Sequence, residues 1–241
     1  EYMYKFTPCE KRGEMWFKRE DKFAPLGYGG INGSKLRQCI WMINQFKPAK
    51  ESMVISGASL KSPQLPMGTA VATHYGMKSV HIVGATNPES SFQRDMVQMA
   101  TWFGGAFKYE SVAYNPFLQS RTKELYESRD KVDFYLNYGI TPANDATDEY
   151  IHGFHATGAF QVQNIPPHIQ SIIIPTGSTN SCISILYGLA RFRDNFPVLK
   201  NVFLVGIGPD KMKMVNSRLD AIIKISGINA KNFTLTWEEK N

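Results

Sequence analysis

The chain has 241 residues, of which 43% are hydrophobic, and carries a formal net charge of +6 with an isoelectric point near 9.1. This length and composition allow one large domain or two small ones, each with a buried core. Because no apolar run reaches the roughly 20 residues of a membrane span and the first residues carry no apolar signal segment, we expect a soluble, cytoplasmic protein without membrane contact.

Short apolar runs alternate with helical patterns along most of the chain, as in β-α-β units built around a parallel sheet. In chain order, the pattern predicts helices at residues 36–46, 63–76, 89–103, from 115 onward, and at 147–163, 183–189 and 211–224. The predicted strands are residues 53–56, 79–83, 106–109, 132–136, 171–175, 202–205 and 233–236. Asn115 is expected to cap its helix, with Pro116 at the first helical position. The expected fold class is therefore α/β, with mostly parallel sheets flanked by helices.

The segment after the strand at 171–175 has the features of a phosphate-binding loop. Small and hydroxyl-bearing residues precede a helical pattern, so backbone N–H groups and the positive helix end converge where a dianion could bind. The loop has no lysine, which argues against a Walker-type triphosphate site and favours a single phosphate monoester on a cofactor. An ordinary strand-to-helix turn capped by Ser or Thr is the alternative. The residues concerned are Gly177, Ser178, Thr179, Asn180 and Ser181.

Lys35 is a candidate nucleophile near the N-terminus. It follows the glycine-rich turn at residues 27–33 and begins the helix that continues to Phe46. Positive potential at a helix N-terminus should lower the pKa of its amine, and a lowered amine pKa is what Schiff-base chemistry requires. The alternative is a solvated surface lysine.

Metal and disulfide chemistry are not expected. The three cysteines, Cys9, Cys39 and Cys182, lie far apart and form no C-x-x-C pair. His152 and His155 are three residues apart without the acidic ligand pattern of a zinc site. Basic residues are scattered and no RNA- or DNA-binding motif occurs, so the net charge suits an anionic substrate without predicting a nucleic-acid partner.

Several motifs together resemble the fold-type II pyridoxal-phosphate (PLP) enzymes, the tryptophan synthase β superfamily. They are the run Lys18-Arg19-Glu20-Asp21, the glycine-rich turn with Asn32 and Lys35, and the downstream phosphate-type loop. The turn at residues 56–64 and the helix at 70–78 are most similar to the 1-aminocyclopropane-1-carboxylate (ACC) deaminase and D-cysteine desulfhydrase branch. Residues 141–144 and 155–158 are similar to the cysteine synthase branch. The resemblance covers nearly the whole chain.

The resemblance implies a two-lobed fold with PLP between the lobes. Residues 1–40 and 136–241 would form the large cofactor-binding lobe, and residues 41–135 the smaller α/β lobe. Lys35 would form the internal aldimine and move a proton, with Asn32 near the cofactor. Ser62, as a further catalytic residue, and Gln64 would lie near the substrate carboxylate, although Ser62 can also serve as a helix N-cap before Pro63. The cofactor phosphate would be held by Gly177, Ser178, Thr179, Asn180 and Ser181.

The sequence departs from the family pattern in three places. Pro63 stands where the family has an Asn that bonds the phenolic oxygen of the cofactor. The deaminase branch places its lysine directly after the Gly-Gly-Asn, whereas a threonine synthase-like spacing favours Lys35. Family members also continue past the last strand with a segment that supplies a partner for the pyridine nitrogen. We therefore expect either a compact variant or a further C-terminal part.

As to function, the resemblance implies a PLP-dependent lyase or deaminase that acts on a small amino acid through Lys35, as a homodimer. A β-replacement synthase of the cysteine synthase type is one alternative, because both reactions share the same cofactor chemistry. A second alternative is an inactive relative that acts as a binding or assembly protein. A third, suggested by the basic charge, is a cofactor enzyme whose amino-acid substrate is attached to a nucleic acid.

Overall fold

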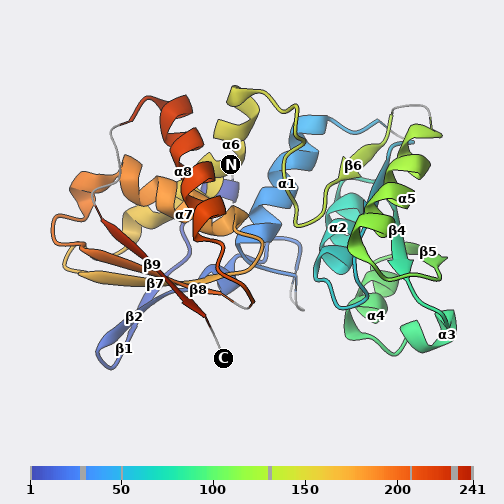
Figure 1. Ribbon diagram of the computed structural model, residues 1–241, viewed down its shortest axis with the longest axis horizontal. Coiled ribbons are helices and arrows are strands. Elements are labelled where there is room, and N and C mark those ends of the chain that lie inside the picture. The colour runs from blue at the N-terminus through green and yellow to red at the C-terminus, as the bar shows by residue number, and fades with distance from the viewer. Residues whose placement is uncertain are drawn as a thin grey trace. The chain divides into compact units, whose positions relative to one another are not determined.

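The computed structural model describes residues 2–27, 31–49, 51–129, 132–206, 208–228 and 233–239, in two compact units (Figure 1). The first unit comprises Glu1–Phe23, Gly33–Gln38 and Asn144–Asn241. The second comprises Ala24–Asn32 and Cys39–Ala143. Helix α1 (Ser34–Phe46) therefore contributes its first residues, through Gln38, to the first unit and the rest to the second.

The first unit is built on a parallel sheet of three strands in the order β7-β8-β9. Helices connect consecutive strands, as β-α-β crossovers require. The connections are α7 (Asn180–Arg191) with the 3-10 turn η4 (Arg193–Asn195), and then α8 (Met212–Ser226). The strands are β7 (Ser171–Thr176), β8 (Asn201–Gly206) and β9 (Thr234–Glu239). Helix α6 (Asp148–Ala159), which continues into the 3-10 turn η3 (Phe160–Asn164), precedes the sheet in the chain.

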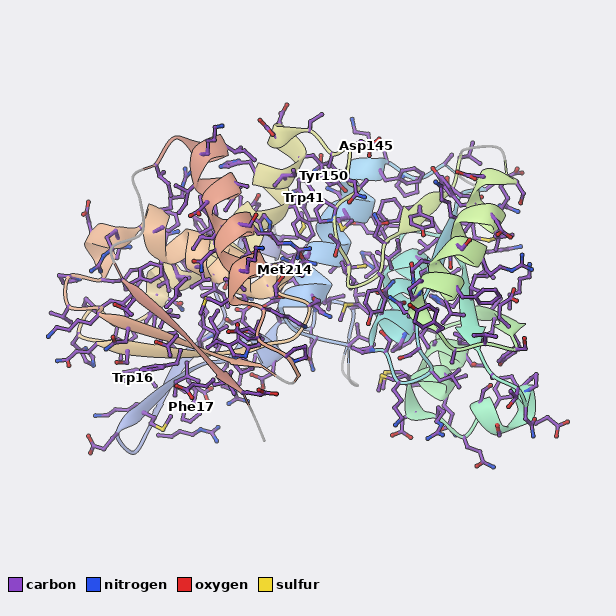
Figure 2. All side chains as sticks on the ribbon, in the orientation of Figure 1. Trp16, Phe17, Trp41, Asp145, Tyr150 and Met214 are labelled. Atoms are coloured by element: carbon purple, nitrogen blue, oxygen red, sulfur yellow. The ribbon has the colours of Figure 1, made fainter. Side chains whose placement is uncertain are left out.

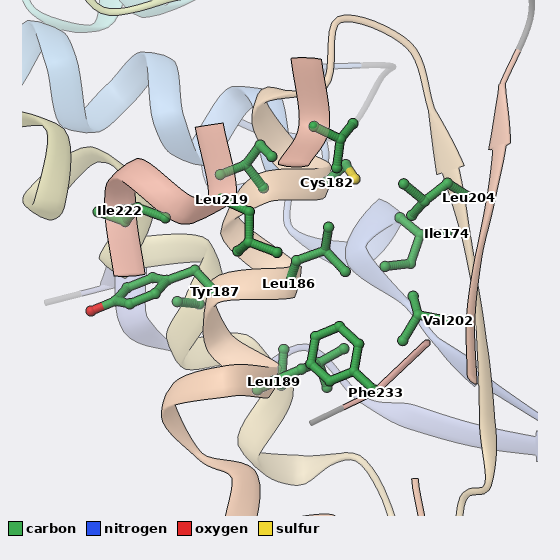
Figure 3. Close-up of a cluster of buried hydrophobic side chains, with 14 of the residues drawn as sticks. Ile174, Cys182, Leu186, Tyr187, Leu189, Val202, Leu204, Leu219, Ile222 and Phe233 are labelled. Atoms are coloured by element: carbon green, nitrogen blue, oxygen red, sulfur yellow. The ribbon is translucent and has the colours of Figure 1, made fainter. Parts of the chain in front are cut away.

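The core of the first unit lies between this sheet and its helices (Figure 3). Side chains alternate across a strand, so Ile174, Val202 and Leu204 point to one face, where they are at most 4% exposed. Leu186 of α7 and Leu219 of α8 pack against them. Alternate residues of the apolar runs that marked these strands in the sequence thus form one buried layer, whereas Ile173 between them is 59% exposed.

A two-stranded antiparallel hairpin near the N-terminus also belongs to the first unit. Strand β1 (Cys9–Arg12) pairs with β2 (Met15–Lys18) across a turn at Gly13, whose φ of 60° suits glycine. The 3-10 turns η1 (Tyr2–Tyr4) and η2 (Glu20–Lys22) flank the hairpin. The sequence analysis did not predict this hairpin. Four of the eight strand residues are charged and four are exposed, among them Phe17, which Figure 2 labels.

The second unit contains a parallel sheet of four strands in the order β5-β4-β3-β6. Ser56 and His81 point from β3 and β4 to α2, where His81 bonds Thr69. Gly57 points to the opposite face, where α5 packs so closely that an added Cβ would meet Thr122. The strands are β3 (Met53–Gly57), β4 (Lys78–Gly84), β5 (Ala106–Glu110) and β6 (Phe134–Leu136), and the helices are α2 (Gln64–His74), α3 (Pro88–Ser91), α4 (Asp95–Trp102) and α5 (Asn115–Glu127).

Three predicted helices differ in detail from the structure. The helix expected at 89–103 is two helices, α3 and α4, and Asn87 caps α3 by accepting from the backbone N–H of Glu89 at 3.0 Å. The helix expected at 147–163 ends at residue 159 and continues as the 3-10 turn η3. Asn115 is the first residue of α5, not its cap, because Tyr114 holds the cap position. The side-chain oxygen of Asn115 instead accepts from Gln119 at 3.1 Å.

The structure confirms the predicted α/β class with parallel sheets flanked by helices. In the part of the chain that the structure describes, no helix has the length and apolar character that crossing a bilayer requires.

Candidate active site

The loop that leaves β7 has an unusual backbone. Thr179, directly before α7, has a φ of 76°, a left-handed conformation that is strained for a β-branched residue. Thr179 and Asn180 are each only 2% exposed. Among the described residues, no atom outside the adjoining chain lies within 4 Å of the place where Gly177 would carry a Cβ. The loop therefore has open space at Gly177, close to the N-terminal turn of a 12-residue helix whose first N–H groups can bind an anion.

Two cationic side chains from the region of α8 contact this loop. The Nη1 of Arg218 donates to Thr179 Oγ1 at 2.8 Å and to Asn180 Oδ1 at 3.3 Å. The Nζ of Lys211 donates to the carbonyl oxygen of Gly177 at 2.7 Å. Figure 2 labels Met214 on the same helix, and Thr179 Oγ1 lies 3.9 Å from its sulfur. Helix α8 and its N-cap residue Lys211 thus bring two positive charges to a loop that has none of its own.

Lys35 belongs to the same unit and faces the same charges. Burial lowers the pKa of its amine, and the positive charge of Lys211 lowers this pKa further. The sequence analysis attributed the shift to the helix N-terminus, so the predicted direction is right and its main causes are different. Across the described residues, none of the ion pairs involves Lys35, Lys211 or Arg218. The site therefore gathers three cations without a carboxylate partner.

A buried polar network supports the loop from behind. Ser184 Oγ donates to the carbonyl oxygen of Asn180 at 3.2 Å and accepts from Gln38 Nε2 at 3.0 Å. It also lies 2.8 Å from His155 Nδ1, and burial, with smaller effects of Arg218 and other charges, lowers the pKa of His155 to about 3. Because the single hydroxyl hydrogen of Ser184 is used on Asn180, the neutral His155 must carry its proton on Nδ1. Helices α1, α6 and α7 are thereby joined at one hydroxyl.

A second network fixes the start of α1 on both sides of Lys35. The carboxylate of Glu20 accepts from Ser34 Oγ at 3.1 Å and from Arg37 Nη2 at 3.4 Å. Arg37 is fully buried and its guanidinium lies 3.7 Å from the ring centroid of Phe23. A buried charge is costly unless it is paired, so Glu20 is needed to keep Arg37 in place. These bonds fix Ser34 and Arg37, which lie on either side of Lys35 in the chain.

The run at residues 18–21 is structural. The Nζ of Lys18 donates to Thr7 O and to Asn164 Oδ1, both at 2.7 Å, and burial lowers the pKa of Lys18 to about 8. Arg19 pairs with Glu10, and also with the neighbouring aspartate of its own run. The motif that supported the family resemblance therefore anchors the N-terminal segment to η3 and to α1.

Three predicted site residues, Asn32, Ser62 and Gln64, belong to the second unit. Asn32 is exposed, and residues 28–30 of the glycine-rich turn before it lie outside the described residues. Ser62 Oγ accepts from the backbone N–H of Gln64 at 3.2 Å, so it caps the start of α2, although Pro63 holds the N-cap position.

Gln64 is only 3% exposed, and its side-chain amide forms hydrogen bonds with backbone groups. Its Nε2 donates to the carbonyls of Leu136 and Asn137 at 3.3 and 3.2 Å, and its Oε1 accepts from Gly139 N at 2.8 Å. In this structure the side-chain amide of Gln64 contacts the loop that follows β6, and its predicted contact with the substrate carboxylate stays a prediction. The described residues also hold no group of three His, Cys, Asp or Glu side chains that could bind a metal.

Lys211 and Arg218 were missed by the sequence analysis. Their helix was predicted at 211–224, but nothing local marks two of its cations as part of a site. One signal was present: a spacing of seven residues places both side chains on the same face of a helix. Which loop that face would meet is decided by tertiary structure alone.

No protein-family model matches the chain. In sequence, it is 47% identical over 237 residues to an O-seryl-dTMP PLP-dependent decarboxylase of Salmonella phage ViI. That match covers 93% of this chain and 55% of the phage enzyme, so the chain spans about half the length of that relative.

Three solved structures of similar fold, each less than 25% identical to the chain, illustrate the structural similarity. An ACC deaminase homologue superposes with a TM-score of 0.66 at 14% identity, covering 93% of this chain and 65% of that one. A serine racemase from maize superposes with a TM-score of 0.59 at 11% identity, covering 92% of this chain and 67% of the racemase chain. Threonine deaminase isoform 2 from Solanum lycopersicum gives 0.56 at 15% identity, with 92% and 59% covered.

Proposed function

The chain has the fold of the fold-type II PLP-dependent enzymes, and from this premise we propose that it is a PLP-dependent decarboxylase whose substrate is an amino acid carried on a nucleotide. The observation that carries the proposal is the 47% identity to the phage O-seryl-dTMP decarboxylase across nearly the whole chain. The net charge of +6 supports it, because a nucleotide-borne substrate is an anion.

The residues of the first unit fit the phosphate of PLP. A phosphate monoester needs several N–H or O–H donors and positive charge, and the loop after β7 offers the first turn of α7 with two cations beside it. The open space at Gly177 leaves room for a group at the loop. Lys35, whose amine is half-buried and shifted toward its neutral form, fits the role of the residue that binds the cofactor covalently.

When bound, PLP supplies an electron sink for the electron pair that is left on the substrate Cα as a bond breaks. In a decarboxylation, the bond between Cα and the carboxylate breaks, carbon dioxide leaves, and Cα takes up a proton. The proposed role of the Lys35 amine is to hold that proton and deliver it to Cα. A serine joined through its side-chain oxygen keeps the free α-amino and α-carboxyl groups that this chemistry needs.

For the second unit we propose supporting roles. Ser62, with the N-terminal turn of α2, would orient the substrate carboxylate, and Asn32 would contact the cofactor. Gln64 would act as a positioning residue, since its three bonds hold the loop at residues 136–139. We also propose that the enzyme works as a homodimer, which light scattering of the purified protein would test.

A lyase or deaminase acting on a small free amino acid is the second candidate. The turn at residues 56–64, which resembles the ACC deaminase branch, favours it. A β-replacement synthase would share the same first steps and differ only in needing an added nucleophile. Both differ from the lead proposal in their products, which are a keto acid with ammonia, or a substituted amino acid, in place of carbon dioxide.

The experiment has two parts. First, the protein is incubated with PLP, reduced with borohydride and digested, and mass spectrometry locates the pyridoxyl group. We expect it on Lys35, absent in Lys35→Ala and retained in Lys213→Ala, an exposed lysine control on α8. Second, carbon dioxide, ammonia, keto acid and sulfide release are measured from O-seryl-dTMP, free serine, ACC and D-cysteine.

Carbon dioxide from O-seryl-dTMP alone supports the lead proposal. Release of ammonia or keto acid from a free amino acid would contradict the lead proposal and support the lyase. A strict need for a second nucleophile would support the synthase. A protein that takes up no PLP and labels no lysine would leave only a binding or assembly role.

A further inference from the structure

We infer that Arg218 makes this site selective for a phosphorylated cofactor, by contributing a charged donor to the phosphate and by holding Thr179 and Asn180 in the binding conformation. The inference rests on the proposed function, because it takes PLP as the ligand. It concerns a residue that lies far from the loop in sequence.

The first argument is the unused donor capacity of Arg218. A guanidinium has five N–H donors, and its bonds to Ser178 O, Thr179 Oγ1 and Asn180 Oδ1 all come from Nη1. Nε and Nη2 make no hydrogen bond to any residue within the described ranges. Arg218 is half-buried, and its Nη1 holds the guanidinium against the loop. They are available to a phosphate.

The second argument is charge. Two other buried or partly buried arginines have carboxylate partners: Arg37 pairs with Glu20, and Arg19 pairs with Glu10. Arg218 has none among the described residues, and burial lowers its pKa with no carboxylate opposing the shift. Lys211 adds a second positive charge to the same loop. A dianionic group is the complement that such an arrangement lacks.

The third argument is the strained backbone of Thr179. A left-handed β-branched residue persists only where its surroundings hold it in place. Arg218 does so by donating to Thr179 Oγ1 at 2.8 Å, which also leaves the hydroxyl hydrogen of Thr179 free to point toward a phosphate oxygen. Met214 sulfur, at 3.9 Å, is a weak competitor for that hydrogen. One arginine therefore both shapes the loop and supplies charge to it.

The test compares two ligands that differ only in the phosphate. Affinities of PLP and of pyridoxal are measured by fluorescence titration for the unaltered protein, Arg218→Gln, Arg218→Lys and Lys213→Gln. The last variant removes one charge from an exposed position of α8 and is the matched control. We expect Arg218→Gln to weaken PLP about 10- to 100-fold, in line with hydrogen bonds to charged groups, and to leave pyridoxal within about 3-fold. The PLP affinity of Arg218→Lys should lie between those of the unaltered protein and Arg218→Gln, because lysine keeps the positive charge but lacks the planar set of guanidinium donors.

A second measurement avoids the cofactor. Inorganic phosphate should raise the Tm of the unaltered protein and of Lys213→Gln, and it should not raise that of Arg218→Gln. If Arg218→Gln does not fold, the comparison rests on Arg218→Lys, for which equal PLP and pyridoxal losses overturn the inference.

If Arg218→Gln weakened the binding of PLP and of pyridoxal equally, Arg218 would have only a structural role. If it left the PLP affinity unchanged, Arg218 would have no role in binding the cofactor. Either result overturns the inference while the labelling of Lys35 still supports the proposed function. A protein that binds no PLP in its unaltered form would overturn both.

Discussion

Ser184→Ala should destabilise the protein, and the hydrogen bonds made by the Ser184 hydroxyl determine by how much. Ser184 is 1% exposed and its oxygen serves three partners: Gln38 Nε2, His155 Nδ1 and the carbonyl oxygen of Asn180. Alanine removes the acceptor for two buried N–H donors. The backbone carbonyl of Asn180 loses less, because it lies in the first turn of α7 and has a helical partner to accept from.

The magnitude follows from counting the donors left unpaired. Each buried, unsatisfied donor costs about 1–3 kcal/mol, and the lost methylene-sized volume is small, so we expect a loss of about 2–4 kcal/mol in the free energy of unfolding. Because the network ends on Asn180 and on Ser181, whose hydroxyl lies 3.5 Å from Gln38 Oε1, PLP affinity should fall as well.

Urea denaturation followed by circular dichroism measures this loss, with Ser217→Ala as the control. Ser217 is exposed on α8, and substitutions at such surface positions usually change stability by less than about 0.5 kcal/mol. A loss for Ser184→Ala no greater than that of Ser217→Ala would refute the reasoning that this hydroxyl satisfies two buried donors. A changed denaturant slope would instead show that the folded state itself had loosened.

Three further predictions concern stability. Burial lowers the pKa of His81 to about 4 and that of His155 to about 3, so below about 6.5 the unfolded state binds more protons at both. Acidification from pH 7 to 5 should therefore cost about 2 kcal/mol for each histidine in urea denaturation, and His81→Asn should lose about 2 kcal/mol less than the unaltered protein. Gly188→Ala would bring a Cβ within 2.4 Å of a backbone oxygen of α6, so a loss of about 1–3 kcal/mol is expected, and an unchanged Tm would contradict this close packing. Glu20→Gln leaves the buried Arg37 without its counter-charge and should cost about 3 kcal/mol, whereas Glu10→Gln, at the exposed hairpin, should cost little by the same assay.

The fold could be predicted from the sequence where local pattern and burial agree. The strands β3, β4, β7 and β8 are buried on at least one face, so their apolar runs were visible, and turns with glycine or proline separated them from helices. The hairpin at residues 9–18 could not be found this way, because its strands carry four charged residues in eight and its pairing comes from a turn at Gly13. The break between α3 and α4 has no sequence signal beyond Asn87 as a cap.

In the candidate site, too, residues with a local sequence signal could be predicted and residues placed only by tertiary structure could not. Lys35 and the loop at 177–181 could be named because each has a local signature, and the structure places both in one unit. The role of Gln64 near the substrate carboxylate came from the family resemblance and stays a prediction, whereas its hydrogen bonds to residues 136–139 depend on tertiary structure and could not be predicted. The pKa shift of Lys35 had the right sign, since a helix N-terminus, burial and a neighbouring cation all oppose an additional positive charge.

Charge that acts at a distance in the chain is the part that sequence reasoning cannot supply. Lys211 and Arg218 lie 30 residues or more beyond the loop, and their spacing predicts a shared helix face without saying what that face meets. The phosphate-type loop lacks a lysine, and from the sequence this argued against a triphosphate site and for a single phosphate monoester. In the folded protein, Lys211 and Arg218 place positive charge beside the loop. The electrostatic potential of the site therefore depends on the whole β-α-β unit. A loop transplanted without α8 would keep its hydroxyls and lose its two cations.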